Sequence, residues 1–195
     1  MASPNTRKKK TDDTINLYNT PSKAMEGLDK YYPEVFDQFK VYYDPCNGLG
    51  KISNYLKERG HKVYTSDKID YGLGDTLQDF LKLESIPDDV NCIIFNPPFL
   101  LTEEFVDHAI KLCRQSNKCR NVLMFNRLNT LESISRGNKF YHNKWNLDTA
   151  YIFSYRVSCT EGINEKPTAN SVSYAWFLLD CTSTPIISEL EWIIK

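Results

Sequence analysis

Short apolar runs alternate with segments of helical spacing along the first two thirds of the chain. The apolar runs are bounded by turn residues, as in Cys92-Ile93-Ile94-Phe95, which is typical of buried strands. The segments between them repeat apolar residues at three- and four-residue intervals, as 102–114 does, which indicates amphipathic helices. Because parallel strands need crossover connections, this alternation predicts a mostly parallel sheet with helices on both faces.

The final third of the chain carries a different pattern. Two longer β-prone runs, 149–157 and 172–179, flank a polar stretch, 161–170, that contains Gly162 and Pro167. This arrangement predicts an antiparallel hairpin at the end of the sheet. The predicted strands are 40–43, 62–65, 91–95, 121–125, 149–157 and 172–179. The predicted helical segments are 21–32 with Thr20 as its N-cap, 49–59, 77–83 as a short helix or turn, 102–114 and 128–134.

Composition bounds the class of protein. The 195 residues are 41% hydrophobic, which suits one globular domain with a full core. We expect a disordered basic and polar tail over 1–14, containing the run 7–10, and a single domain over 15–195. No apolar run approaches the length of a membrane span and the first residues are polar, so we expect neither a membrane span nor a signal peptide. The formal charge of −1 leaves any nucleic-acid surface to a local patch.

The cysteine and histidine positions predict no metal site. The six cysteines lie mostly inside apolar segments and form no Cys-x-x-Cys pair, and the three histidines fall in unrelated segments. We therefore expect reduced, buried thiols and a cytoplasmic location, without a disulfide framework.

The tetrapeptide Asn96-Pro97-Pro98-Phe99 ends the third predicted strand. The two prolines fix φ and remove two backbone donors, so the chain leaves the sheet in one stiff conformation. Asn96 Oδ1 and the Pro97 carbonyl oxygen can then accept hydrogen bonds from an exocyclic NH2 group, while Phe99 stacks on the ring that carries it. The plainer alternative is a strand end followed by a helix with Thr102 as its N-cap.

A polar, glycine-containing segment follows the first predicted strand, where Asp44 precedes Gly48 and Gly50. Glycines at these positions let the backbone approach a ligand, and the next helix supplies free N–H groups. The third glycine of a dinucleotide-binding loop is absent, because Ser53 occupies its position, and the Asp44 carboxylate would repel a pyrophosphate. The acid instead favours an ammonium group, such as that of a bound amino acid.

Two further acids follow in order. Asp67 ends the second predicted strand, 67 − 44 = 23 residues after Asp44, where it can accept hydrogen bonds from two ribose hydroxyls. In Asp79-Phe80, the carboxylate can accept a hydrogen bond from the amino group of a purine, and the phenyl ring can pack against the purine's face. Any one of these acids, taken alone, is more often a turn or cap residue than a ligand-binding residue. All of them in this order are less easily explained by chance.

These segments resemble the ordered motifs of class I S-adenosylmethionine-dependent methyltransferases, and within that class the amino methyltransferases that modify N6 of adenine. Residues 18–21, Tyr-Asn-Thr-Pro, are similar to a Tyr-x-Thr-Pro element of the same family that lines the methionine end of the cofactor. Downstream, the segments 127–132, 153–157 and 174–177, with Arg136, resemble small phage and prophage adenine methyltransferases. The resemblance covers residues from about 17 to about 180.

The resemblance implies a Rossmann-like α/β fold with a mostly parallel seven-stranded sheet and an antiparallel terminal hairpin. It implies S-adenosylmethionine as the cofactor, held by Tyr18, Thr20, Pro21, Asp44, Pro45, Gly48, Gly50, Asp67, Lys68, Asp79 and Phe80. It also implies a catalytic set formed by Asn96, Pro97, Pro98 and Phe99.

Cationic and aromatic residues follow the catalytic motif, a mix that suits a phosphate track with stacking. A solvated face with core aromatics explains the mix equally well. The expected nucleic-acid-binding residues are Arg127, Arg136, Lys139 and Arg156, near Lys144, Tyr141 and Trp145.

The expected function is N6 methylation of adenine in DNA by a phage- or prophage-encoded enzyme, acting in the host cytoplasm as a monomer or homodimer. Asn96 stands where many DNA enzymes of the class carry Asp, and the chain lacks an inserted target-recognition domain. Two alternatives therefore stay open. One changes the substrate to adenine in RNA or a glutamine amide in protein, and the other is a cofactor-binding module without turnover.

Overall fold

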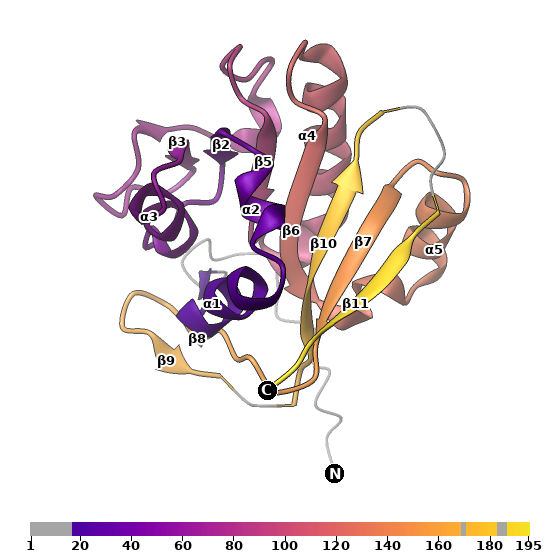
Figure 1. The fold of residues 1–195 in the computed structure, drawn as a ribbon. Helices are drawn as coiled ribbons and strands as arrows, with labels where there is room; N and C mark the ends of the chain where they lie inside the picture. The colour runs from indigo at the N-terminus through magenta and orange to yellow at the C-terminus, as the bar shows by residue number, and fades with distance from the viewer. Residues whose placement is uncertain (1–16, 169–170, 183–186) are drawn as a thin grey trace.

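The computed structural model of the chain describes residues 17–168, 171–182 and 187–195. The expected tail with its basic run, and Asn170 at the end of the polar stretch, lie outside the described residues. The central sheet has the strand order β11-β7-β10-β6-β5-β2-β3-β4 (Figure 1). Its strands are β2 (Val41–Asp44), β3 (Lys62–Asp67), β4 (Thr76–Leu77), β5 (Cys92–Phe95), β6 (Asn121–Arg127), β7 (Asn146–Phe153), β10 (Tyr174–Asp180) and β11 (Glu189–Ile193).

The strands run parallel except for β10, which is antiparallel to both of its neighbours, β6 and β7. The predicted mostly parallel sheet with an antiparallel strand near the chain's end is therefore confirmed. The central sheet has eight strands instead of the expected seven, and two of them, β4 and β11, lie outside the predicted strands. Strand β11 pairs with β7 in parallel register. Strand β11 lies outside the predicted strands, although its alternating polar and apolar residues over 189–192 are typical of a half-buried strand.

The predicted terminal hairpin is formed by β7 and β10, with Trp176 opposite Tyr151. The described part of the segment between these strands is not a simple loop. It contains the short strands β8 (Thr160–Glu161) and β9 (Lys166–Pro167), which pair with each other. Strand β8 also pairs with β1 (Tyr18–Asn19), so β1, β8 and β9 form a second, three-stranded sheet.

Helices cover both faces of the central sheet. They are α1 (Ser22–Tyr31), α2 (Glu34–Asp37), α3 (Lys51–Glu58), α4 (Thr102–Gln115) and α5 (Ile134–Tyr141), with short 3-10 turns η2 (Phe80–Lys82), η3 (Phe99–Leu101) and η4 (Leu128–Leu131). The prediction of a helix start at Thr20 is wrong in one detail. Pro21 occupies the N-cap of α1, and the Thr20 hydroxyl instead accepts a hydrogen bond from Asn96.

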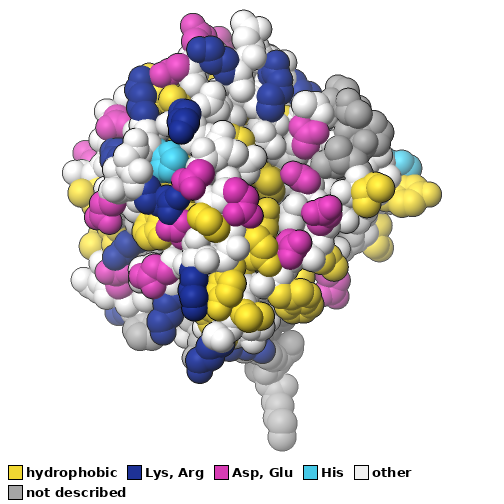
Figure 2. All heavy atoms as spheres, viewed as in Figure 1, with side chains coloured by type: hydrophobic (Ala, Val, Ile, Leu, Met, Phe, Trp, Pro, Cys, Tyr) yellow, Lys and Arg dark blue, Asp and Glu magenta, His cyan; other side chains and the backbone are white. Residues whose placement is uncertain are grey.

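Two hydrophobic clusters hold these layers together. On one face, α1, α2 and α3 pack against the sheet through residues such as Leu28, Phe36 and Leu56. On the other face, α4 packs through Val106 and Ile110. On the side that carries α1 to α3, basic side chains are interspersed with acidic ones and form no single basic patch (Figure 2). Ion pairs such as Arg59 with Asp29 and Lys62 with Asp89 belong to this mixed surface.

Candidate active site

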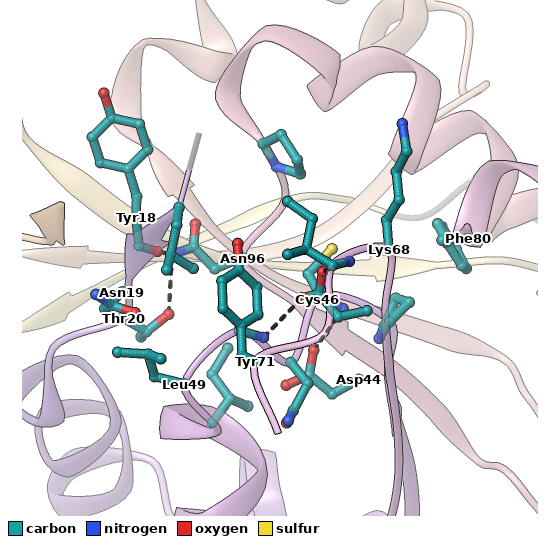
Figure 3. A pocket seen from close by; sticks show the side chains of 18 of the residues that line it. Tyr18, Asn19, Thr20, Asp44, Cys46, Leu49, Lys68, Tyr71, Phe80 and Asn96 are labelled. Atoms are coloured by element: carbon teal, nitrogen blue, oxygen red, sulfur yellow. Dashed lines mark hydrogen bonds between the residues drawn. The ribbon is translucent and has the colours of Figure 1, made fainter. Parts of the chain in front are cut away.

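A pocket lies over the carboxyl ends of β2, β3 and β5. Because these strands are parallel, the loops that follow them lie at the same edge of the sheet. Figure 3 shows Asn96, Tyr71 and Asp44 around this space. The predicted site residues that line it are Tyr18, Thr20, Asp44, Pro45, Gly48, Asp67, Lys68, Asp79, Phe80, Asn96 and Pro98. The structure thus brings together predicted site residues that are up to 98 − 18 = 80 positions apart in sequence.

Four predicted site residues lie around the pocket without lining it. Pro21 precedes α1, Gly50 is the N-cap of α3, Pro97 is buried, and Phe99 begins the 3-10 turn η3. These residues shape the backbone that carries the lining residues.

The glycine loop has the left-handed backbone conformation that its sequence suggests. Gly48 has φ 48° and Gly50 has φ 70°, values that residues with a Cβ rarely adopt. A Cβ on Gly48 would also lie 3.0 Å from Leu17 Cδ1, so Gly48 allows the segment before β1 to approach the loop. Ser53 occupies the position where a dinucleotide-binding loop would have glycine. Its hydroxyl group donates a hydrogen bond to Asn47 Oδ1 at 2.5 Å and so stabilises the loop.

Asp67 lies at the end of β3 and faces the glycine loop. Its carboxylate accepts hydrogen bonds from the backbone N–H of Gly48 at 2.8 Å and of Ile69 at 3.0 Å. Burial raises the pKa of Asp67, while these backbone N–H groups act in the opposite direction. Since a carboxylate offers roughly four acceptor positions, it can still accept hydrogen bonds from a ligand.

Asp44 is buried at the end of β2, with 1% of its surface exposed. Its pKa is raised to about 7, chiefly by burial and also by the neighbouring Asp67, against the lowering effects of the Cys46 N–H and the charge of Lys57. The Cys46 N–H donates to Asp44 Oδ1 at 3.0 Å. A buried acid of this kind is stabilised as a carboxylate when a positive ligand group arrives beside it.

Asp79 and Phe80 form the far wall of the pocket. Asp79 caps η2 by accepting a hydrogen bond from the Leu81 N–H at 3.2 Å. Phe80 is buried at 2% exposure and packs edge-on against His108, so its ring is rigidly placed where it borders the pocket. The predicted helix or turn over 77–83 is in fact the end of β4 followed by η2.

Asn96 directly follows the carboxyl end of β5 and points into the pocket (Figure 3). Its Nδ2 donates to the Tyr18 carbonyl oxygen at 2.8 Å and to Thr20 Oγ1 at 3.1 Å. Its Oδ1 is buried, and none of the described residues donates a hydrogen bond to it. A buried acceptor without a donor costs free energy, and such groups concentrate where a ligand supplies the missing partner.

An aromatic and cationic group surrounds Phe99. The Arg127 guanidinium lies over the Phe99 ring, 4.1 Å from its centroid, and the rings of Tyr18 and Tyr174 lie 4.8 Å and 6.0 Å away. The half-buried Phe99 is therefore held in a fixed orientation beside the pocket. Thr102 does not cap α4, since Leu101 precedes the helix, and the Thr102 hydroxyl donates to the Phe99 carbonyl oxygen at 3.2 Å.

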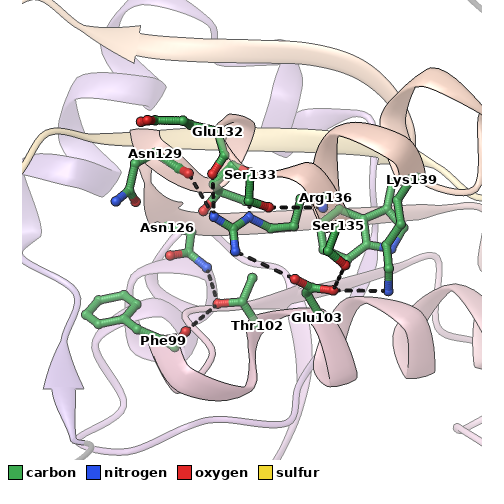
Figure 4. A network of polar contacts seen from close by, with 12 residues as sticks. Phe99, Thr102, Glu103, Asn126, Asn129, Glu132, Ser133, Ser135, Arg136 and Lys139 are labelled. Carbon is green, nitrogen blue, oxygen red and sulfur yellow. Dashed lines mark hydrogen bonds and ion pairs between the residues drawn. The ribbon is translucent and has the colours of Figure 1, made fainter. Parts of the chain in front are cut away.

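The structure places the expected nucleic-acid-binding residues in different surroundings. Arg136 donates to the carbonyl oxygens of Thr130, Asn129 and Glu132, and it lies 3.7 Å from a Glu103 carboxylate oxygen (Figure 4). Lys139 pairs with Asp107 at 2.5 Å. Both cations therefore stabilise the junction of η4, α4 and α5.

The remaining members of the set lie at opposite edges of the sheet. Arg156 follows β7 at the edge that holds the pocket, is exposed, and donates to Ser173 Oγ. Lys144 is also exposed but precedes β7, at the other edge. Trp145 is 1% exposed and belongs to the core, whereas Tyr141 is 81% exposed.

Sequence patterns do not identify several residues that line the pocket. Ile69 and Tyr71 belong to an irregular loop after Asp67, where no periodicity marks them. Asn19 occupies the variable position of the Tyr-x-Thr-Pro element and nevertheless lines the pocket with 4% exposure. The other unpredicted lining residues are Leu17, Cys46, Asn47, Leu49, Lys51, Ile52, Leu81, Leu101 and Phe105.

The cysteines are all unpaired, and five of the six are buried. Among the described residues, no group of three or more His, Cys, Asp or Glu side chains is arranged to hold a metal ion. No helix of the described part of the chain is both long and apolar enough to span a bilayer.

Comparisons with known proteins define the fold. No protein-family profile matches the chain, and no curated protein matches it in sequence. A "putative RNA methyltransferase" from Pyrococcus horikoshii is similar in structure, with a TM-score of 0.61 and 15% identity over 88% of this chain and 90% of that one. A "putative class I S-adenosylmethionine-dependent methyltransferase" from Listeria monocytogenes is also similar in structure. Its TM-score is 0.54 and its sequence identity is 13%, over 94% of this chain and 68% of that one. The chain therefore has the class I methyltransferase fold.

Proposed function

We propose that this protein is an S-adenosylmethionine-dependent methyltransferase that methylates N6 of adenine in DNA. The observation that carries the proposal is Asn96 Oδ1, a buried acceptor that no described residue satisfies, at the end of a strand in a pocket of the class I methyltransferase fold. An exocyclic amino group of a flat base is a donor that would satisfy it.

The pocket fits the cofactor by the chemistry of its lining. Asp44 suits the ammonium group of the methionine part, and Gly48 lets that part approach the backbone. Asp67 has acceptor positions left for ribose hydroxyls, and Asp79 with Phe80 borders the place for an adenine ring. When bound, S-adenosylmethionine supplies the methyl group from a positively charged sulfonium.

Asn96 and Pro97 act on the nucleophile. Adenine N6 is a weak nucleophile because its lone pair is delocalised into the ring. Asn96 Oδ1 and the Pro97 carbonyl oxygen accept the two N6 hydrogens, which draws the lone pair out of the ring plane and holds it for in-line attack. The proline pair keeps both acceptors in place, and a target base in duplex DNA must be flipped out of the stack to reach them.

DNA is the proposed substrate for two reasons. Phe99, with Arg127 over it, offers a rigid aromatic group beside the pocket, and the exposed Arg156 lies at the same edge of the sheet. The likeness of the downstream segments to phage and prophage adenine methyltransferases supports the same substrate and a phage or prophage origin. Since Arg136 and Lys139 are held by neighbouring groups, we expect few phosphate contacts and a weak dependence of DNA binding on salt. Because the chain has no inserted target-recognition domain to read bases, we expect loose sequence specificity.

The second candidate is adenine N6 in RNA. It is favoured by the likeness of the whole chain to the P. horikoshii protein, whose name describes an RNA enzyme. The chemistry at Asn96 would be the same, so only the substrate distinguishes the two functions.

The deciding experiment offers the protein methyl-labelled S-adenosylmethionine with separate DNA, RNA and protein pools, followed by nucleoside or amino-acid analysis of the product. We expect N6-methyladenine in DNA for the natural chain and about 100–1,000-fold slower transfer for Asn96→Ala, because one polarising contact is lost. Asn121→Ala, at the opposite end of the sheet, is the matched control and should keep full activity.

The outcomes separate the alternatives. Label in RNA alone selects the second candidate, and label in protein glutamine selects a protein methyltransferase. N4-methylcytosine as the product in DNA would still indicate a DNA amino methyltransferase, but its target base would be cytosine and not adenine. Cofactor binding without label in any pool would indicate a binding module.

A further inference from the structure

The small sheet of β1, β8 and β9 is separate from the central sheet, and both residues of β1 line the pocket. Figure 1 shows β8 and β9 apart from the central strands. Strand β1 has two residues, so it cannot hold its position without partners. Its partners come from the β8–β9 hairpin, about 140 residues later in the chain. Tyr18 pairs with Glu161, Asn19 pairs with Thr160, and the Gly162 N–H donates to the Leu17 carbonyl oxygen at 2.9 Å.

The side chain of Asn19 adds a second connection to the same hairpin. Its Nδ2 donates to the Gly162 carbonyl oxygen at 3.0 Å and to Thr160 Oγ1 at 3.3 Å. The side chain is almost fully buried, so water does not compete for these bonds. The tip of the hairpin is held as well, by an ion pair of 2.9 Å between Glu165 and Lys51 at the start of α3.

Strand β1 in turn fixes the orientation of the Asn96 amide. The Tyr18 carbonyl oxygen is an acceptor only, so it must face the NH2 side of that amide. A rotation of the amide by 180° would place Oδ1 against this carbonyl oxygen and break the bond. The position of the Tyr18 carbonyl therefore decides that Asn96 Oδ1, and not Nδ2, is the group left without a partner.

We propose that Asn19 is a positioning residue for methyl transfer. By tying β1 to the β8–β9 hairpin, it holds the Tyr18 carbonyl and the Thr20 hydroxyl where they keep Asn96 Oδ1 directed at the substrate amino group. The role rests on the proposed function of Asn96 and extends it to a residue whose side-chain NH2 group is bonded to the β8–β9 hairpin.

The first test is single-turnover methyl transfer at saturating cofactor by Asn19→Ala in the full chain. We expect the rate to fall about 10–100-fold, because small misplacements of a reacting group have effects of that size. Asn19→Asp, which keeps the shape of the side chain but removes the donor, should lose as much. Thr160→Val leaves the shorter Asn19 bond, to the Gly162 carbonyl oxygen, in place and should lose less. Asn121→Ala again serves as the control.

A double-mutant cycle separates positioning from general damage. If Asn19 acts through Asn96, adding Asn19→Ala to Asn96→Ala should cause no further loss of rate. An independent loss in the double mutant, or an unchanged rate in Asn19→Ala, would overturn the proposal.

A readout without turnover keeps the two proposals distinguishable. The side-chain NH2 signals of Asn96 in nitrogen-15 NMR can be assigned by their absence in Asn96→Ala. In Asn19→Ala they should shift and exchange with solvent faster, while the backbone signals of α4 stay in place. If the natural chain transfers no methyl group, the proposed function fails, and unchanged Asn96 signals would separately overturn the positioning role. If Asn19→Ala does not fold, Thr160→Val combined with Glu165→Gln weakens the same connection and should give a smaller shift in the same direction.

Discussion

The backbone N–H of Gly48 donates to the Asp67 carboxylate at 2.8 Å, so one side chain joins the loop after β2 to the end of β3. The same carboxylate lines the pocket beneath the proposed ribose position. Asp67 therefore shapes the glycine loop and is available to the ligand at the same time.

Asp67→Ala should weaken S-adenosylmethionine binding by about 1–3 kcal/mol, because hydrogen bonds to the ribose hydroxyls are lost and the Gly48 N–H loses its acceptor. Isothermal titration calorimetry measures the change. Asp89→Ala is the matched control, since Asp89 pairs with Lys62 outside the pocket. Equal affinity in both variants would place the ribose elsewhere.

Asp44 should make both folding and cofactor binding depend on pH. Its pKa rises from 3.8 in the unfolded chain to about 7 in the ligand-free fold, so the folded state binds the extra proton between these values. The free energy of unfolding of the ligand-free protein should therefore fall as the pH rises from about 4 to about 7. Asp44→Asn should remove this part of the slope in urea unfolding series at several pH values.

Cofactor binding should show the opposite trend. A positively charged ammonium group favours the ionised carboxylate, so affinity should increase between about pH 6 and pH 8, with release of a proton. Calorimetry in buffers of different ionisation enthalpy detects that proton. Affinity that does not vary with pH would indicate that Asp44 stays ionised without the ligand.

Two helical glycines should respond oppositely to alanine. A Cβ on Gly27 in α1 would lie 2.5 Å from Tyr155 Oη and 3.0 Å from Phe153 Cε1, so Gly27→Ala should destabilise the fold by about 1–3 kcal/mol through overpacking. A Cβ on Gly137 in α5 meets no atom within 4 Å, so Gly137→Ala should stabilise by about 0.5–1 kcal/mol through helix propensity. Thermal unfolding of the pair measures both, and equal shifts would contradict the packing of α1 on β7.

Charge reversal at Arg156 should weaken DNA binding about equally across sequences and lower the salt slope by about one contact, because one phosphate contact is lost. Fluorescence anisotropy at several salt concentrations measures it. Lys144→Glu makes the same charge change on an exposed residue at the other edge of the sheet and should leave binding unchanged. Similar losses in the two variants would mean that binding follows net charge and not a site.

The sequence predicts the parts of the fold that repeat a clear pattern. The four parallel strands β2, β3, β5 and β6, and helices α3 and α4, have the expected apolar spacing and lie where it places them. Strands β1, β8 and β9 have two residues each, too few to show a period, and they form because each finds a partner far away in the sequence.

The site was predictable to the same extent. Acids and glycines that follow predicted strands can be recognised in the sequence. Because parallel strands have their carboxyl ends at the same edge of the sheet, these residues can be expected to lie close together. The contacts of Arg136 and Lys139 could not be predicted, because they depend on where η4 and α5 meet α4. The orphaned oxygen of Asn96 is likewise visible only once Tyr18 and Thr20 are placed beside its nitrogen.

The pairing of β1 with β8 has a consequence for the order in which the protein assembles. Strands β2 to β6 and their helices make mostly neighbouring contacts and can form while later residues are still being synthesised. The contact between Tyr18 and Glu161 closes a loop of 161 − 18 = 143 residues, so it must wait until the β8–β9 segment has left the ribosome. A nascent chain that stops short of β8 would thus lack β10 and β11, would leave β7 without its partners in the central sheet, and would have an unformed active site.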